Sequence, residues 1–136
     1  MPSQEFIDEA DRILGSILHN MTTFDRDSIQ DVTFFVDNTP NQYHMQATGT
    51  PPDHILLGIY EGDARSVTIF EQSLKAAAHV FGNLLNAIWQ VLDHEIYQHA
   101  LGWDHVLQTE ELGLMPAFAI SSKGESLRQW ESPACG

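Results

Sequence analysis

The feature that most constrains the fold is a helical pattern that runs from Glu71 to Leu101. Its apolar residues recur at alternating spacings of four and three, and they are Leu74, Ala78, Phe81, Leu85, Ile88 and Leu92. Because an α-helix turns once in about 3.6 residues, this spacing places them on one face and predicts a helix packed on the core. Gly82 interrupts the pattern and predicts a division into a shorter and a longer helix.

The end of this helical segment is rich in histidine. Three of the seven histidines in the chain, His94, His99 and His105, lie within twelve residues, and Glu95 follows the first of them. Neutral imidazole is a common zinc ligand, and a catalytic zinc typically takes about three protein ligands and one water. A glutamate beside the first histidine is suited to deprotonate that water, as in His-Glu-x-x-His hydrolases. The run therefore indicates a zinc site.

The two histidines within the helix stand five residues apart, whereas the ligands of the common motif stand four apart. On a regular α-helix at about 100° per residue, positions four apart are rotated by about 40° and positions five apart by about 140°. An unbroken α-helix would therefore separate the rings of His94 and His99. A π-bulge with an i→i+5 hydrogen bond absorbs one residue and returns both rings to one face. The sequence predicts such a bulge between them.

A third ligand is expected just beyond the helix. Gly102 predicts the helix end, because glycine adopts the left-handed conformation without the penalty of a Cβ atom. The chain can then turn back toward the metal, and either Asp104 or His105 would complete the ligand set. The alternative without a metal is that histidines at a helix end simply complement the helix dipole.

Shorter patterns predict the elements that surround this helix. Apolar residues that recur every three or four positions indicate an amphipathic helix, and runs of β-branched and aromatic residues indicate strands. These patterns give a helix over about residues 3–20, strands over 32–36, 55–60 and 66–70, a loop over 38–53, and a flexible tail over 121–136. The last two strands are expected to be antiparallel, because polar residues and a glycine join them as in a hairpin.

Two of these strands, together with the histidine helix, carry a resemblance to a known family. The chain contains Leu56-Leu57-Gly58-Ile59-Tyr60-Glu61-Gly62, then Val67-Thr68-Ile69-Phe70, then the helix bearing His94-Glu95. This order resembles the bacterial minimal zincin-like metallopeptidase family, whose members have a Leu-Leu-Gly-Leu-Tyr-Glu-Gly segment, a short Ile-x-Leu-Phe strand and a helix with His-Glu-x-x-His. The resemblance spans about residues 28 to 112 of this chain.

The resemblance implies a role for each residue of the histidine run. His94 and His99 would be zinc ligands, Glu95 the general base, and Asp104 or His105 the third ligand. In simple register the second histidine of the family aligns with Gln98, so His99 has to take its place. The longer spacing is similar to that of dipeptidyl peptidases of the third type, which use His-Glu-x-x-x-His. The resemblance also implies that strand 55–60 or 66–70 offers an edge to the backbone of a peptide substrate.

A second resemblance concerns the end of the run. His99-x-x-Gly102-x-Asp104-His105 is similar to the ending found in bacterial ribosomal-RNA maturation endoribonucleases, although their first histidine is followed by glycine. The net charge of −13, from 19 acidic and 6 basic residues, works against binding a phosphate backbone. Nucleic acid is therefore not expected as a partner, and a peptide or protein substrate is.

The remaining composition bounds the class of protein. At 136 residues the chain is long enough for a single hydrophobic core. No apolar run approaches the roughly 20 residues of a membrane span, and the N-terminus lacks the basic and apolar regions of a signal peptide. The lone Cys135 excludes an internal disulfide. These features lead us to expect a cytoplasmic protein with no membrane contact.

Together the patterns predict an α+β fold. We expect a minimal zincin-like domain over residues 1–120, in which about three or four strands pack against the metal-bearing helix and the N-terminal helix. The function expected first is zinc-dependent peptide hydrolysis. The alternatives are a catalytically inactive module that binds peptides or proteins, which an unbroken helix through His94 and His99 would favour, and a zinc-dependent endoribonuclease.

Overall fold

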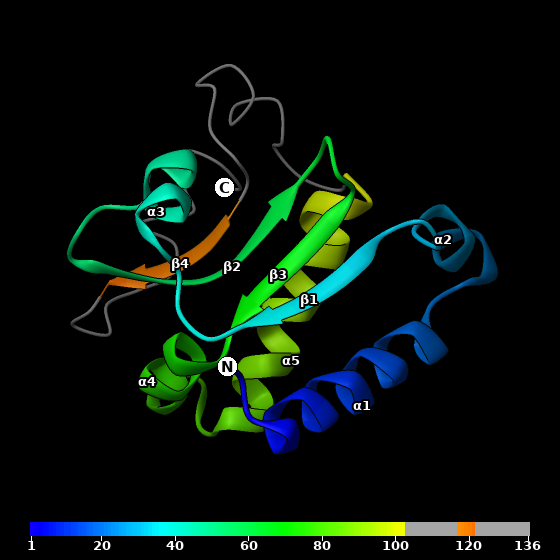
Figure 1. Cartoon of the computed structure of the whole chain (residues 1–136). Coiled ribbons are helices and arrows are strands. Elements are labelled where there is room, and N and C mark those ends of the chain that lie inside the picture. The colour runs from blue at the N-terminus through cyan, green and yellow to red at the C-terminus, as the bar shows by residue number, and fades with distance from the viewer. Residues whose placement is uncertain (103–116, 122–136) are drawn as a thin grey trace.

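The computed structural model describes residues 1–102 and 117–121, and these form five α-helices, one π-helical turn and four strands (Figure 1). In chain order they are α1 (Gln4–Asn20), α2 (Thr23–Ser28), β1 (Thr33–Asp37), α3 (Gln42–Thr48), β2 (His54–Glu61), β3 (Ser66–Phe70), α4 (Glu71–Phe81), α5 (Leu84–His94), the π-helical turn η1 (Glu95–Ala100) and β4 (Ala117–Ser121). The predicted α+β class is confirmed. No helix in these ranges is both long and apolar enough to cross a bilayer.

The strands form one mixed sheet in the order β1-β3-β2-β4. β1 and β3 are parallel, and β2 runs antiparallel to both of its neighbours. The predicted hairpin is confirmed, since Ile59 of β2 lies opposite Thr68 of β3. A register shift between Leu56 and Gly58 interrupts the pairing of β2 with β4, as an extra residue in a β-bulge does.

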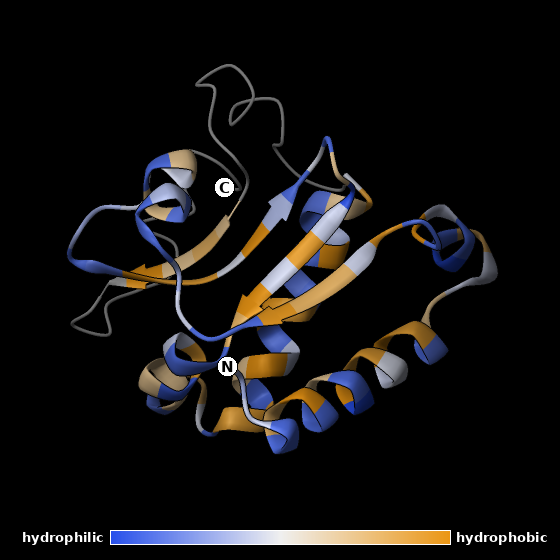
Figure 2. Cartoon of the chain, viewed as in Figure 1, coloured by the Kyte–Doolittle hydropathy of each residue, from blue (hydrophilic) through white to orange (hydrophobic). Residues whose placement is uncertain are grey.

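The main core lies between the sheet and two helices. α1 and α5 pack against each other and cover one face of the sheet (Figure 1), and the strands carry mostly apolar residues (Figure 2). The cluster includes Phe6, Ala10, Ile13 and Ile17 of α1, Ala87, Ile88, Val91 and Leu92 of α5, and Leu57, Val67, Ile69, Phe118 and Ile120 of the strands. A smaller cluster on the other face packs against Met45 of α3.

The predicted core stripe is correct at its ends and wrong at Leu85. Leu74 and Leu92 are buried, but 46% of Leu85 is exposed. Gly82 takes a φ of 96° at the end of α4, and the side chain of Asn83 then caps α5 by accepting from the backbone N–H of Asn86 at 2.8 Å. This break restarts the helix in a new register, so the four-and-three spacing does not continue through it.

The predicted loop over residues 38–53 contains α3, so that prediction is wrong over Gln42–Thr48. Asn41 and His44 form a capping box, in which Asn41 Oδ1 accepts from the His44 backbone N–H at 2.9 Å and His44 Nδ1 accepts from the Asn41 backbone N–H at 3.0 Å. Gly49, with a φ of 68°, ends the helix. The helix is fixed by its caps rather than by an apolar stripe.

A sheet of about three or four strands was expected, but the position of the fourth strand was not predicted. Ala117–Ser121 pairs with the outer edge of β2, so Ser121, the first residue of the predicted tail, belongs to the sheet. The rest of that tail lies outside the described residues. The strand signal that the sequence offers here is a short continuous apolar run, Ala117-Phe118-Ala119-Ile120, which is consistent with a buried strand.

A buried carboxylate joins the start of α1 to the start of α4. Only 1% of Glu71 is exposed, and its Oε1 accepts from the Ser3 backbone N–H at 2.7 Å while Oε2 accepts from Ser3 Oγ at 2.9 Å. Lys75 Nζ lies 2.6 Å from the same Oε2. Its hydrogen bonds with Lys75 and Ser3 hold the pKa of Glu71 below its usual value, against the effect of burial.

We predict that Glu71→Ala lowers the free energy of unfolding by about 1–3 kcal/mol, because it removes the acceptor of the buried Ser3 groups. Urea unfolding at neutral pH measures this loss. Lys75→Ala is the control, since the lysine is 46% exposed and its ion pair should contribute at most about 1 kcal/mol. Equal losses in the two variants would contradict the anchoring role of Glu71.

Candidate metal centre

The histidines lie where α5 changes its winding. α5 continues into the π-helical turn η1 without a break, since both His94 and Glu95 keep right-handed helical backbone angles. At the end of the turn, the backbone N–H of Leu101 donates to the carbonyl of Ile96 at 2.8 Å, five residues back. The predicted π-bulge between His94 and His99 is therefore confirmed.

This winding brings the two imidazoles together. His94 Nε2 and His99 Nε2 lie 3.1 Å apart, and the ring centroids are separated by 4.8 Å. Two nitrogens that share a tetrahedral zinc at roughly 2.0–2.1 Å each would stand roughly 3.3–3.4 Å apart. The separation in the structure is therefore close to that of a shared ligand pair.

Glu95 completes a group of three side chains that could hold a metal ion. Ligand atoms of His94, Glu95 and His99 all lie within 4.8 Å of one another. Glu95 is fully buried and only 4% of His99 is exposed. Two imidazole nitrogens and a carboxylate oxygen form a donor set that suits zinc. The residues present could hold a metal ion, with Glu95 either as a ligand or beside the metal's water.

The sheet supports this group at Gly58 of β2. A Cβ atom on Gly58 would lie 2.8 Å from Val91 Cγ1, 3.3 Å from the carbonyl oxygen of Thr68 and 3.6 Å from Glu95 Cγ. The helix can therefore pack this closely on β2 only because position 58 has no side chain. The register shift in the pairing of β2 with β4 also lies here, between Leu56 and Gly58.

Burial sets the protonation of the first histidine. It lowers the pKa of His94 to about 3, with a further contribution from the charge of His99. The imidazole is therefore neutral at neutral pH. A metal ion requires this neutral form, so no proton has to leave His94 before binding.

The two candidates for a third ligand follow Gly102 in the sequence. Gly102 takes the left-handed conformation expected of it, with a φ of 71°. Asp104 and His105, the two candidates that follow, lie outside the described residues. The structure therefore brings together His94, Glu95 and His99 of the five predicted site residues.

One neighbour of the metal centre was missed in the sequence. The ring of Phe118 in β4 meets the ring of His94 edge to face, at 4.4 Å between centroids and an interplanar angle of 90°. Because Phe118 is 24 positions beyond His94, no local spacing connects the two. The available signal was the short apolar run Ala117-Phe118-Ala119-Ile120, which is consistent with a buried strand.

The free strand edge implied by the resemblance is absent at both expected strands. β3 is paired with β1 and β2, and β2 is paired with β3 and β4. The expectation that strand 55–60 or 66–70 offers an edge to a substrate is therefore wrong for the described structure. β4 occupies the edge of β2 that β3 leaves open, and its Phe118 ring meets the ring of His94.

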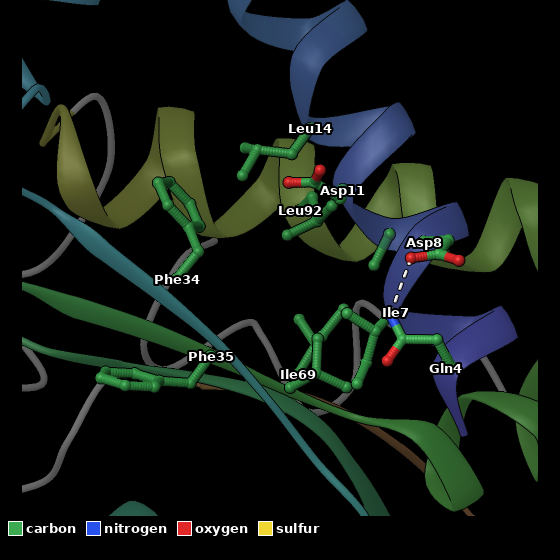
Figure 3. A pocket seen from close by; sticks show the side chains of 11 residues that line it. Gln4, Ile7, Asp8, Asp11, Leu14, Phe34, Phe35, Ile69 and Leu92 are labelled. Atoms are coloured by element: carbon green, nitrogen blue, oxygen red, sulfur yellow. Dashed lines mark hydrogen bonds between the residues drawn. The ribbon is translucent and has the colours of Figure 1, made fainter. Parts of the chain in front are cut away.

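A separate pocket of about 440 Å³ lies between α1 and β1 (Figure 3). Asp8 and Asp11 of α1 face the apolar side chains of Phe34 and Ile69 there, and Asp8 Oδ1 accepts a hydrogen bond from Gln4 Nε2 at 2.8 Å. Its lining includes neither of the metal-binding histidines nor Glu95. The pocket is therefore distinct from the group of His94, Glu95 and His99, which is the candidate metal site.

Comparison with protein-family models, with curated proteins and with solved structures found no match for this chain. The assignment of a function therefore depends on the residues of the site.

We predict that the metal-free protein loses stability on acidification through His94. Its pKa is lower in the folded protein than in the unfolded chain, so below about pH 6.5 the unfolded chain binds the extra proton. The free energy of unfolding should then fall by up to about 1.4 kcal/mol per pH unit between about pH 6 and pH 4.

Urea unfolding at pH 7, 6 and 5 in the presence of a chelator measures this slope. His94→Gln is the control, because its amide does not titrate. All other titrating side chains are the same in both proteins, so the difference in slope reports on His94. A wild-type slope no steeper than that of the variant would contradict the assignment.

Proposed function

We propose that this protein is a zinc-dependent peptide hydrolase. The observation that carries the proposal is the π-helical turn, which aligns His94 with His99 despite their five-residue spacing and leaves Glu95 beside them. This arrangement reproduces what His-Glu-x-x-His achieves on a regular helix. We propose zinc as the metal, a zincin-like domain as the scaffold, and Asp104 or His105 as the third ligand.

Each residue has a distinct task in this proposal. Zinc bound at the site would lower the pKa of its water to about 7 and polarise the scissile carbonyl. His94 and His99 supply neutral nitrogen donors. The Glu95 carboxylate accepts a proton from the attacking water and returns it to the leaving amine. The burial of Glu95 keeps competing water away from this proton transfer.

The local winding supports a hydrolase over an inactive binding module. An unbroken α-helix would have turned the two rings about 140° apart and left no ligand pair. The chain instead forms six π-helical residues between Glu95 and Ala100. π-bulges occur frequently at functional sites, and this one places two imidazoles at the separation that a shared metal needs, which a module without a metal does not require.

The charge distribution favours peptide over RNA as the substrate. In the described part of the chain, each lysine and arginine already contacts an acid or backbone carbonyls: Arg12 with Glu9, Arg26 with the end of α1, Arg65 with Asp31 and Lys75 with Glu71. A ribonuclease needs cations that contact phosphate groups. Peptide recognition depends instead on main-chain hydrogen bonds and apolar pockets.

We predict that Glu95→Gln retains zinc but hydrolyses peptides at least about 100-fold more slowly, because the amide cannot accept the proton of the water. A cleavage assay on a peptide library, with zinc content by elemental analysis on the same samples, measures both properties. Glu9→Gln is the control, since Glu9 lies on the exposed side of α1 and pairs with Arg12. A Glu95→Gln variant as active as wild type would contradict the role of Glu95.

A further inference from the structure

The outer edge of β2 is the strand edge beside the metal centre. Gly58 of β2 contacts Val91 and lies next to Glu95, so the strand runs directly beneath the metal-binding helix. An extended peptide could reach His94 by pairing along this edge, as in recognition by β-strand addition. In the structure β4 is paired there, with Phe118 opposite Gly58 and Ala119 opposite Leu56.

The side chains of β4 complete the closure. Phe118 and Ile120 face the helices and belong to the main core. Only 4% of Phe118 and 1% of Ile120 is exposed. Ala117 and Ala119 face the opposite side, where they join the smaller cluster. The ring of Phe118 lies against the ring of His94 at 4.4 Å. One large side chain of β4 therefore covers the first metal ligand directly.

The pairing of β4 is interrupted at the same place. The register shift between Leu56 and Gly58 leaves one residue of β2 without a cross-strand partner in β4. Such bulges disrupt the ladder locally and redirect side chains, and they are over-represented at sheet edges and beside active sites. Gly58 adds to this effect, since it presents no side chain to pack against Phe118. The interruption in the β4 pairing therefore lies next to Gly58, the residue of β2 that packs against Val91 and Glu95.

From these contacts we infer that β4 occupies the place of the peptide substrate, so that the chain closes its own metal centre until β4 leaves the edge of β2. This inference rests on the proposed hydrolase function. It also defines the substrate class, because β4 is a template for what the edge accepts. The preferred peptide is extended and apolar, with a bulky aromatic side chain opposite Gly58 and small side chains on either side of it.

The first test compares Phe118→Ala with Ile120→Ala in the zinc-loaded full chain. Both variants remove a buried apolar side chain of β4 that belongs to the main core. The ring of Phe118 lies against the ring of His94, whereas Ile120 lies two positions further along β4, opposite Ile55. The rate of zinc loss to an excess of chelator should rise at least tenfold in Phe118→Ala and stay within about twofold of wild type in Ile120→Ala. Equal rates in all three proteins, or equal acceleration in both variants, would overturn the inference.

The second test uses a peptide with the sequence of residues 116–122, Pro-Ala-Phe-Ala-Ile-Ser-Ser, as a probe in trans. The double variant with Phe118→Ala and Ile120→Ala should bind it at least tenfold more tightly than wild type, because both anchors of β4 are gone. The same peptide with aspartate in place of phenylalanine should not bind. Equal affinity for wild type and double variant, or no binding to either, would overturn the template role of β4.

These outcomes separate the inference from the proposed function. If the probe binds the double variant but no variant hydrolyses any peptide, the peptide site stands and the hydrolase function fails. If wild type hydrolyses peptides, and neither zinc loss nor probe binding responds to the β4 substitutions, the hydrolase stands and the closure by β4 fails.

Discussion

The site depends on a single change in backbone hydrogen bonding. Where α5 passes into η1, the bonding changes from i→i+4 to i→i+5, and the bond from Leu101 to Ile96 closes the turn. His94 and His99 stand five residues apart, one more than the ligands of the common motif. The wider turn absorbs this extra residue. The 3.1 Å between the two imidazole nitrogens is its direct consequence. Without it, no other described feature would assign a metal to this protein.

The sheet and the core hold the turn in place. η1 follows the most deeply buried part of α5, and the contact at Gly58 brings the helix against β2 at the level of Glu95. Packing of this kind fixes the positions of the three side chains without a bound metal. Burial also keeps His94 neutral. Geometry and protonation therefore have the same structural origin, the close packing of one helix on one strand.

The sequence was informative wherever the signal was local. The rotation per residue predicted the π-helical turn, the residue type predicted the conformation of Gly102, and the polar, glycine-containing connection predicted the hairpin of β2 and β3. Each of these signals depends on neighbouring residues. β4 was missed because its pairing joins positions 60 apart, such as Gly58 and Phe118. α3 was missed because the caps at Asn41 and Gly49 define it, with no apolar stripe. The contact of Phe118 with His94 depends on this non-local pairing, so the spacing of residues in the sequence could not predict it.

The most direct test of the shared metal site is X-ray absorption spectroscopy of the zinc-loaded protein. We predict two imidazole nitrogens at roughly 2.0–2.1 Å from zinc, and their loss in the variant with His94→Ala and His99→Ala. The matched control is His79→Ala, which removes an exposed histidine of α4 and should leave the spectrum unchanged. A zinc bound only through oxygen, or a spectrum that the double substitution does not alter, would contradict the account.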